Sequence, residues 1–381
     1  MKTIRLIADD LTGALDSAAQ FTARVAALPV LLAQESARIA LAPGQSAAIS
    51  MGSRDLDQAA ASARATALAP FLAPADIAFL KMDSLLRGHW PVELSRLLAA
   101  FPERTCIFAP AFPAERRITE QGRQIAPDPD GRMAPLSRVP LEALAAAGLR
   151  ARVAAADATP LPDPGGVLVC DASRDEDLKK IVATAPAMGT ALLWCGSAGL
   201  ARALSGHAPP RSMLKAAPPL VLIGSRHPVT LAQIAAVPPH AALKVALGPD
   251  AAASAARIAA DIERLPCIVT VDLPASTAPA RAASVIAERF AAVLPRLAPP
   301  AQLVVIGGET LLAVCHAVGA SALSLTGEWQ VGVPSSELSG GIWNGVTLIS
   351  RSGAFGRPDF LDKLLGAASA SAGRAAVSIE R

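Results

Sequence analysis

The chain has 381 residues, about two and a half times a common domain length, so two domains are expected. Hydrophobic residues make up 52% of it and charged residues 18%, below the typical charged share of about 25%, which excludes disorder as the main state. The formal net charge of +3 is too small to neutralise a polyphosphate backbone, and nine Phe, four Trp and no Tyr offer few platforms for base stacking. A nucleic-acid partner is therefore not expected.

Five cysteines lie far apart, without a Cys-x-x-Cys pair, and predict reduced, buried thiols in a cytoplasmic protein. The first apolar run stops at Asp9, whereas the apolar core of a secretory signal needs about 7 to 15 residues, so no signal peptide is expected. The longest uncharged stretch, residues 310–327, contains a histidine and two glycines, and a spanning helix needs about 20 predominantly apolar residues. It predicts a core helix, a turn and a strand, and no membrane partner.

In the first half, short apolar runs of strand length alternate with stretches of helical length. One such stretch, residues 12–25, shows helical spacing of Leu11, Leu15 and Ala18. This alternation predicts a parallel sheet with helices on its faces. Residues 125–138, with prolines, glycine and charges, predict a surface hairpin or lid. The predicted strands are 4–8, 30–33, 47–50, 77–82, 106–111, 167–172 and 191–196.

Residues 207–218 are rich in proline and lack either periodicity, which predicts a linker between domains. The same strand and helix alternation restarts after it. The fold class expected is therefore α/β with two domains, 1–206 and 219–381, each a mainly parallel sheet flanked by helices. The strands predicted in the second domain are 220–225, 243–247, 267–272, 303–308 and 347–350.

Polar side chains follow several strands of the first domain, where ligands bind in open α/β sheets, beyond the carboxyl ends. Asp9 and Asp10 follow the first strand and open a helix. Two carboxylates there suit a helix cap, a metal ion or the hydroxyls of a ligand. Capping alone would employ only one of the two acids.

A second cluster follows strand 77–82, and a third, which contains Arg54, follows strand 47–50. Arg binds a carboxylate through two parallel hydrogen bonds while Asp accepts from a hydroxyl, so these clusters suit an anionic, hydroxylated small molecule. A salt-bridged turn open to water is the alternative, and three clusters in one domain favour a shared pocket over it. The second cluster consists of Lys81, Asp83, Ser84 and Arg87.

In the second domain, glycine-containing loops follow the strands. Gly lets the backbone approach a ligand closely, and amides at a helix N-terminus favour phosphate oxygens. Ordinary turn chemistry is the alternative for each loop taken singly. A positive φ is expected at Gly308. The loops contain Gly224 and Ser225, then Gly307, Gly308, Glu309 and Thr310, and finally Gly353 in the turn 352–356.

Signatures of other enzyme classes are missing. The sequence contains no G-x-x-x-x-G-K-[ST], no H-E-x-x-H and no cysteine pairs with zinc spacing. It also lacks G-x-G-x-x-G, which speaks against the alternative of a nicotinamide-dependent dehydrogenase.

Eight segments, in order and spread over nearly the whole chain, resemble the four-carbon acid sugar kinase family, whose members phosphorylate erythronate, threonate or 3-oxo-tetronate. The resemblance implies an N-terminal acid-sugar-binding domain and a C-terminal nucleotide-binding domain. The segments are ADDLTGALDSAAQF (8–21), KMDSLLRG (81–88), APAFPAERRIT (109–119), CDASRDEDL (170–178), CGSAGLA (195–201), GSRHPVTLAQ (224–233), VVIGGETLLA (304–313) and SRSGAFGRPDFL (350–361).

The same resemblance implies an ATP-dependent kinase that uses Mg²⁺, with the metal ligands left open. Asp83 or Asp10 is expected to accept the proton of the attacking hydroxyl, and Glu309 is a third candidate. The acid sugar is expected at Asp9, Arg54, Lys81, Ser84 and Arg87. ATP is expected at Ser225, Gly307, Gly308, Glu309, Thr310 and Gly353.

The chain departs from the family pattern at Leu85, Glu309, Arg351 and Ala354, where the family usually has Thr, Asp, Lys and Gly. Leu85 removes a hydroxyl near the expected sugar site, so the exact substrate stays open. A kinase for a branched relative such as 3-oxo-isoapionate is one alternative, and a non-catalytic sensor of nucleotide and sugar acid is another. The oligomeric state is open too, with a homodimer as one option.

Overall fold

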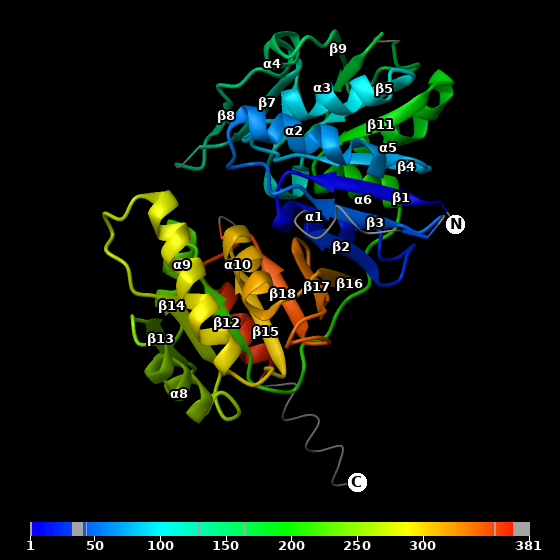
Figure 1. Ribbon diagram of the computed structural model, residues 1–381. Coiled ribbons are helices and arrows are strands. Elements are labelled where there is room, and N and C mark those ends of the chain that lie inside the picture. The colour runs from blue at the N-terminus through cyan, green and yellow to red at the C-terminus, as the bar shows by residue number, and fades with distance from the viewer. Residues whose placement is uncertain are drawn as a thin grey trace, which may run out of the picture. The chain divides into compact units, whose positions relative to one another are not determined.

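A computed structural model gives the structure of the chain and describes residues 2–32, 41–42, 44–128, 130–162, 165–353 and 356–368. The chain divides into two compact units, Met1–Pro209 and Pro210–Arg381 (Figure 1). Within each unit the strands are mainly parallel, and helices pack on them. The expected fold class, α/β with two such domains, is confirmed.

The sheet of the first unit contains eight strands in the order β2-β3-β1-β4-β11-β5-β10-β9, and every neighbouring pair is parallel. Most residues of the central strands are buried because helices cover both faces. The strands are β1 (Ile4–Ala8), β2 (Leu28–Leu32), β3 (Ala47–Ser50), β4 (Ile77–Lys81), β5 (Arg104–Ala109), β9 (Ala151–Ala154), β10 (Val167–Cys170) and β11 (Ala191–Gly196).

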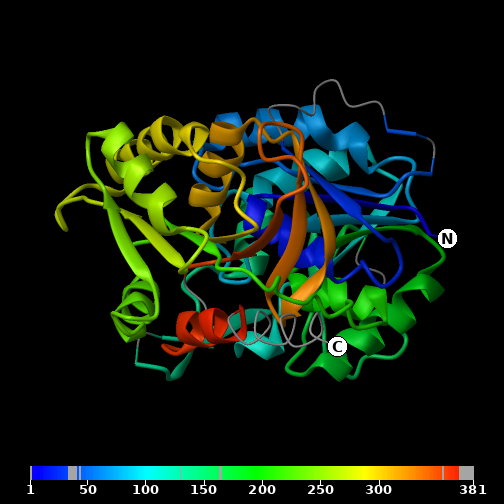
Figure 2. The same ribbon diagram turned by 90° about the horizontal axis from the view of Figure 1, so that it is seen from below.

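Helices α2 and α3 lie side by side on one face of this sheet, and α1, α5 and α6 lie on the other (Figure 2). The helix expected over residues 12–25 is shorter, because α1 ends at Ala19. The hydroxyl of Thr22 donates to the Ala19 carbonyl at 2.6 Å, and this local bond competes with the helical pattern. The helices are α1 (Leu11–Ala19), α2 (Gln58–Leu68), α3 (Trp90–Ala100), α4 (Pro140–Ala146), α5 (Asp175–Thr184) and α6 (Ala198–Ser205).

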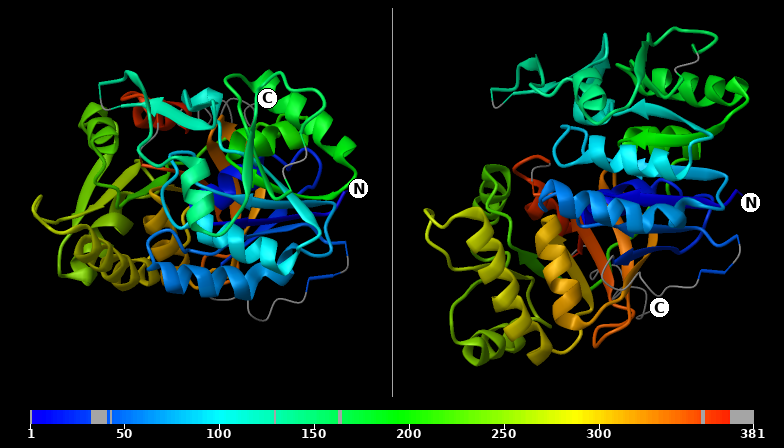
Figure 3. Two further views of the ribbon diagram at one scale, coloured as in Figure 1. Left: turned by 90° about the horizontal axis from the view of Figure 1, so that it is seen from above. Right: turned by 45° about the horizontal axis from the view of Figure 1, so that its top comes forward.

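The segment predicted as a surface hairpin forms β7 (Arg123–Pro127) and β8 (Met133–Pro135), which pair antiparallel. With β6 (Ile118–Glu120) they make a small sheet separate from the main one (Figure 3). The Asp171 carboxylate ties it to the end of β10 by accepting from the Gln121 and Gly122 amides, both at 2.8 Å.

The sheet of the second unit has the order β13-β14-β12-β15-β18-β17-β16. Its first five strands are parallel, and β17 and β16 add an antiparallel hairpin. The strands are β12 (Leu220–Ile223), β13 (Leu243–Leu247), β14 (Cys267–Val271), β15 (Gln302–Ile306), β16 (Ala322–Gln330), β17 (Val333–Ser339) and β18 (Thr347–Arg351), and the helices are α7 (Pro228–Ala236), α8 (Ala251–Asp261), α9 (Pro279–Val293), α10 (Gly308–Val318) and a last one over 360–368.

The stretch expected to be a linker is extended, and its second half packs on the second unit. The Ser212 amide donates to the Glu328 carbonyl, and the Glu328 amide donates to the Pro210 carbonyl. Leu214 is buried in the core of the second unit.

Two further expectations, on the uncharged stretch and on the cysteines, are confirmed in the described residues. The uncharged stretch forms helix α10, a turn and strand β16, as predicted. All five cysteines are free and buried. Among the helices that the structure describes, none is long and apolar enough to cross a membrane.

Candidate functional site

The register of the first sheet brings three strand ends together. Ala8 of β1 pairs with Ser50 of β3 on one side and with Lys81 of β4 on the other. The chain segments that follow these strands therefore leave the sheet at neighbouring positions on its carboxyl edge. The three polar clusters expected from the sequence lie there, as adjacent loops.

Arg54 joins the first and third clusters. Its guanidinium binds Asp9 through Nε and Nη2 at 2.8 and 2.9 Å, and Asp10 through Nη1 and Nη2 at 2.6 and 2.9 Å. Asp9 is 1% exposed, so this ion pair is largely out of water. Burial raises the pKa of Asp9, the charge of Arg54 acts against this, and the charge of Asp10 adds to it.

Asp10 caps α1 as well as binding Arg54. Its Oδ1 accepts from the Gly13 amide at 2.8 Å, and its Oδ2 accepts from the Thr12 hydroxyl at 2.7 Å. Capping is thus present, but it accounts for only one of the two adjacent acids. Asp9 forms an ion pair with Arg54 instead.

Asp83 and Arg87 form a second ion pair, in the loop after β4. Arg87 Nε and Nη2 donate to the two carboxylate oxygens of Asp83 at 2.6 and 3.0 Å. Burial by itself would raise the pKa of Asp83, but hydrogen bonds from Arg87 and the charges of Arg87 and Arg54 outweigh it and hold that pKa well below its usual range. Arg87 is 57% exposed, which leaves its outer edge accessible to a ligand.

Lys81 is the predicted site cation to which no acid of the described residues binds directly. It is 6% exposed, and within the described residues its ammonium group makes no hydrogen bond or salt bridge. A side chain added at Gly13 would place its first carbon 2.8 Å from Lys81 Nζ and 2.5 Å from Asp10 Oδ1. Gly13 therefore makes the room that Lys81 needs beside Asp10.

Residues outside the predicted set complete this edge. Arg117 donates to the Ser84 hydroxyl at 2.5 Å, and Gln124 of β7 donates to the Ser84 carbonyl at 2.9 Å. Arg138 donates to the carbonyls of Leu86 and Gly88 at 2.9 and 2.7 Å. The hairpin region thus holds the loop that carries Asp83 and Arg87. The signal available in the sequence was the concentration of arginines from residue 116 to 138.

The glycine loops of the second unit also meet at the carboxyl edge of their sheet. Ile306 of β15 pairs with Ile223 of β12 and with Arg351 of β18. The Thr230 hydroxyl donates to the Gly353 carbonyl at 2.7 Å and lies 3.1 Å from Ser225 Oγ, which connects two of the loops. A Cβ at Gly353 would lie 2.0 Å from Ser225 Oγ.

The residue with the special backbone conformation is Gly307, whose φ is 111°. The expectation of a positive φ at Gly308 is wrong, because Gly308 already belongs to the first turn of α10. No side chain caps this helix, so its first amides face the loop. Thr310, 3% exposed, lies beside Gly307 and Gly224, since a Cβ at either glycine would approach its hydroxyl within 3 Å. Such an edge suits phosphate oxygens.

Three of the four residues that depart from the family pattern lie in the described part of the chain. Glu309 is exposed in the first turn of α10, and Leu85 is half-buried beside Ser84. Arg351 is buried, with its guanidinium 3.9 Å from the centre of the Phe360 ring. Ala354 lies outside the described residues. Throughout the described ranges, no group of three or more His, Cys, Asp or Glu side chains is arranged to hold a metal ion.

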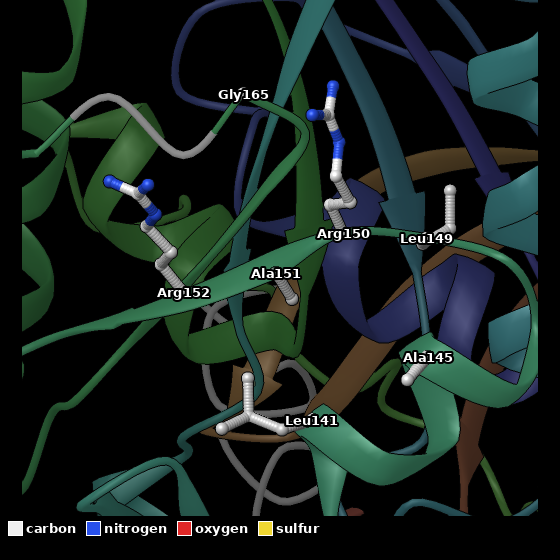
Figure 4. A pocket seen from close by; sticks show the side chains of 7 residues that line it. All are labelled: Leu141, Ala145, Leu149, Arg150, Ala151, Arg152 and Gly165. Carbon is white, nitrogen blue, oxygen red and sulfur yellow. The ribbon is translucent and has the colours of Figure 1, made fainter.

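A surface pocket of about 720 Å³ lies elsewhere in the first unit, between α4 and the start of β9 (Figure 4). Strand β9 is at the edge of the sheet, and the pocket contains none of the predicted site residues. It is lined by Leu141, Ala145, Leu149, Arg150, Ala151, Arg152 and Gly165.

Comparison with known proteins gives the same division of the chain. Residues 4–143 and 130–204 match the sugar-binding N-terminal domain, and residues 220–361 match the nucleotide-binding C-terminal domain. A D-threonate kinase of Cupriavidus necator is 31% identical over 87% of this chain and 89% of its own length. A D-threonate kinase of Bordetella bronchiseptica is 28% identical over 94% and 95%.

Two solved structures share the fold. One, from Salmonella typhimurium LT2, has a TM-score of 0.73 at 22% identity and covers 96% of this chain and 99% of its own. The other, from Haemophilus influenzae, has a TM-score of 0.67 at 18% identity over 95% and 99%. The matches to both domains cover most of the sequence, and the family and the sugar-acid kinase class expected from the residues are confirmed. The chain belongs to the four-carbon acid sugar kinase family, with its sugar-binding N-terminal domain and its nucleotide-binding C-terminal domain.

Proposed function

We propose that this enzyme transfers the γ-phosphoryl group of ATP to a hydroxyl of a four-carbon acid sugar, with D-threonate as the first candidate. The observation that carries the proposal is a set of ion pairs whose carboxylates are buried or half-buried, at a single sheet edge, in a chain of this family. The same edge has one buried lysine that is paired with no acid in the described residues. The names of the two relatives support D-threonate as the substrate.

In this proposal the first unit holds the sugar acid. The Lys81 ammonium and the outer edge of Arg87 bind its carboxylate, because both are cations with donors left over. The hydroxyls donate to Asp10 and Asp83, whose oxygens are fixed in position by Arg54 and Arg87. Asp9 supports Arg54, and Ser84, held by Arg117, borders the ligand.

The second unit is proposed to hold ATP. The phosphates lie against Ser225, Gly307, Gly308, Thr310 and Gly353, where the α10 amides lack a side-chain cap. In sites of this kind Mg²⁺ is bound mainly by phosphates and by one or two carboxylates. Glu309 supplies one exposed carboxylate, which fits this pattern. In the described residues Glu309 is not part of a group of three or more possible metal ligands. The metal would neutralise charge on the phosphates.

Direct measurement of ADP release tests the proposal. We expect ATP- and Mg²⁺-dependent turnover with one member of a panel of D-threonate, L-threonate, erythronate, their 3-oxo forms and 3-oxo-isoapionate. Turnover with only the branched acid would assign the enzyme to that alternative. Binding of both ligands without any ADP release would favour the sensor. Light scattering of the same sample tests the predicted option of a homodimer.

Arg87→Leu should weaken acid-sugar binding much more than ATP binding. The substitution removes a guanidinium proposed to bind the substrate carboxylate, and loss of one partner of such a pair costs on the order of 2 to 5 kcal/mol when it is buried. Since Arg87 is 57% exposed, we expect a cost at or just below the lower end of that range, about 10- to 50-fold in KM for the sugar. Steady-state kinetics with each substrate varied in turn gives the two KM values.

The matched control for this prediction is Arg96→Leu, because Arg96 is an exposed arginine of α3 that donates to the Ser62 hydroxyl, away from the strand ends. Its KM values should stay at the native level. An unchanged sugar KM in Arg87→Leu would remove Arg87 from the substrate site.

A further inference from the structure

Glu93 is a buried acid beside the proposed sugar site that has no role in the scheme above. It lies in the first turn of α3 and is 0% exposed. Its Oε1 accepts from the Ser53 hydroxyl at 2.5 Å, whereas its Oε2 is buried and has no hydrogen-bond partner in the described residues. An ionised carboxylate in such a place is only half satisfied.

Ser53 connects Glu93 to the ion pairs at the strand ends. The Ser53 amide donates to the Asp9 carbonyl at 2.9 Å, and the next amide, of Arg54, donates to the same oxygen at 3.3 Å. The Arg54 side chain then binds both Asp9 and Asp10. Glu93 therefore contacts the short segment from which Arg54 reaches the site.

The charge of Glu93 is poised to change near neutral pH. Burial raises its pKa to about 7, the hydrogen bond from Ser53 and the charge of Arg54 act against this, and the charge of Asp9 adds to it. Apart from Lys81, the neighbouring ionisable groups already make hydrogen bonds. The pairs are Asp10 with Arg54, Asp83 with Arg87, His89 with the Leu56 carbonyl, Arg64 with the Met51 carbonyl and Arg96 with the Ser62 hydroxyl.

We propose that Glu93 is a positioning residue that acts through Ser53 and Arg54 and couples acid-sugar binding to the uptake of a proton. The proposal rests on the proposed function, because it takes an acid sugar as the ligand of this edge. An anion bound at this edge makes a negative charge on Glu93 less favourable, so the bound state favours the neutral carboxyl. The neutral form also lowers the cost of leaving Oε2 without a partner, because an unpaired neutral group costs less than an unpaired charge.

The sign of the pH dependence follows from this coupling. Below about pH 7 the free enzyme already carries the proton, and binding needs no uptake. Above that pH the proton must be taken up from solution, so affinity for the acid sugar should fall as pH rises. ATP affinity should not follow this profile, because its proposed loops belong to the second unit.

Calorimetry without ATP, with D-threonate or whichever acid of the panel binds, tests the proposal. Titrations at pH 7.5 in two buffers of different ionisation enthalpy give the number of protons bound. For the native enzyme we expect uptake of about half a proton per ligand and an affinity that falls about three- to tenfold from pH 6.5 to 8.5. Glu93→Gln, which keeps the shape and stays neutral, should show no uptake and a nearly constant affinity.

Ser53→Ala provides a second variant that leaves the carboxyl group in place. Loss of the hydrogen bond to the charged form should raise the pKa of Glu93, so the fall in affinity should begin at a higher pH than in the native enzyme. Asp177→Asn is the control, because Asp177 is another buried carboxylate of the first unit that caps α5. It should keep the native profile.

Native proton uptake in Glu93→Gln would overturn the proposal and point to Asp9. An unshifted profile in Ser53→Ala would overturn it as well, even if Glu93→Gln fails to fold. A different outcome would overturn the proposed function alone: the acid binds with proton uptake, but no ADP is released when ATP is added. Absence of binding by every acid of the panel would overturn both.

Discussion

Gly307→Ala should lower the affinity for MgATP about tenfold to a hundredfold while the affinity for the acid sugar stays native. Gly307 has φ 111° and ψ 136°, a conformation that costs a residue with a side chain about 1 to 3 kcal/mol. The added carbon would also lie 2.9 Å from Thr310 Oγ1. The backbone strain and the close contact with Thr310 are relieved if the loop that leads into α10 moves. Such a movement displaces the α10 amides that are proposed to bind phosphate. Calorimetry with MgATP measures the effect.

Gly248→Ala is the matched control. Gly248 follows β13 in the same unit, has no positive φ and has no atom within 4 Å of an added Cβ. Its affinity for MgATP should be native. If Gly307→Ala bound MgATP like the native enzyme, or lost the acid sugar instead, the nucleotide would have been assigned to the wrong loop or the wrong unit.

Asp83→Asn should lower kcat by about 10² to 10⁴ while the protein still folds. The pKa of Asp83 is held low, so the side chain is a carboxylate at neutral pH that accepts two hydrogen bonds from the Arg87 guanidinium. Asparagine keeps the shape but loses the charge, one acceptor and the ability to take a proton. Steady-state kinetics at saturating ATP and acid sugar, with circular dichroism as a check of folding, measures the effect.

The comparison with Asp10→Asn decides which acid receives the proton. Asp10 is bound by Arg54 and by the Gly13 amide, so the amide substitution also weakens the cap of α1. Near-native turnover in Asp83→Asn together with loss of activity in a folded Asp10→Asn would assign the proton to Asp10. Activity in both variants would leave Glu309 as the leading candidate.

The sequence alone specifies the class of the fold. Short, largely apolar runs such as 4–8 and 220–225 are typical of strands buried on both sides, and the helical stretches between them require parallel connections. It also determined the kinds of residue at the strand ends, because charged side chains directly after a buried strand remain near the edge of the sheet. The ends of helices are less well specified by the sequence, since α1 ends six residues earlier than its apolar pattern predicts.

Which strand ends are neighbours depends on how distant segments of the chain pack into the sheet. The order β3-β1-β4 brings Arg54, Asp9 and Asp83 to one edge, and the lengths of the connections do not fix that order. The same holds for Arg117 and Arg138, whose hairpin region contacts a loop about 30 to 50 residues away. Glu93 appears in sequence as an ordinary polar residue of an amphipathic helix, and it becomes a buried acid only because α3 packs its first turn beneath Ser53. Burial and long-range pairing depend on packing between segments, and no local pattern of residues specifies them.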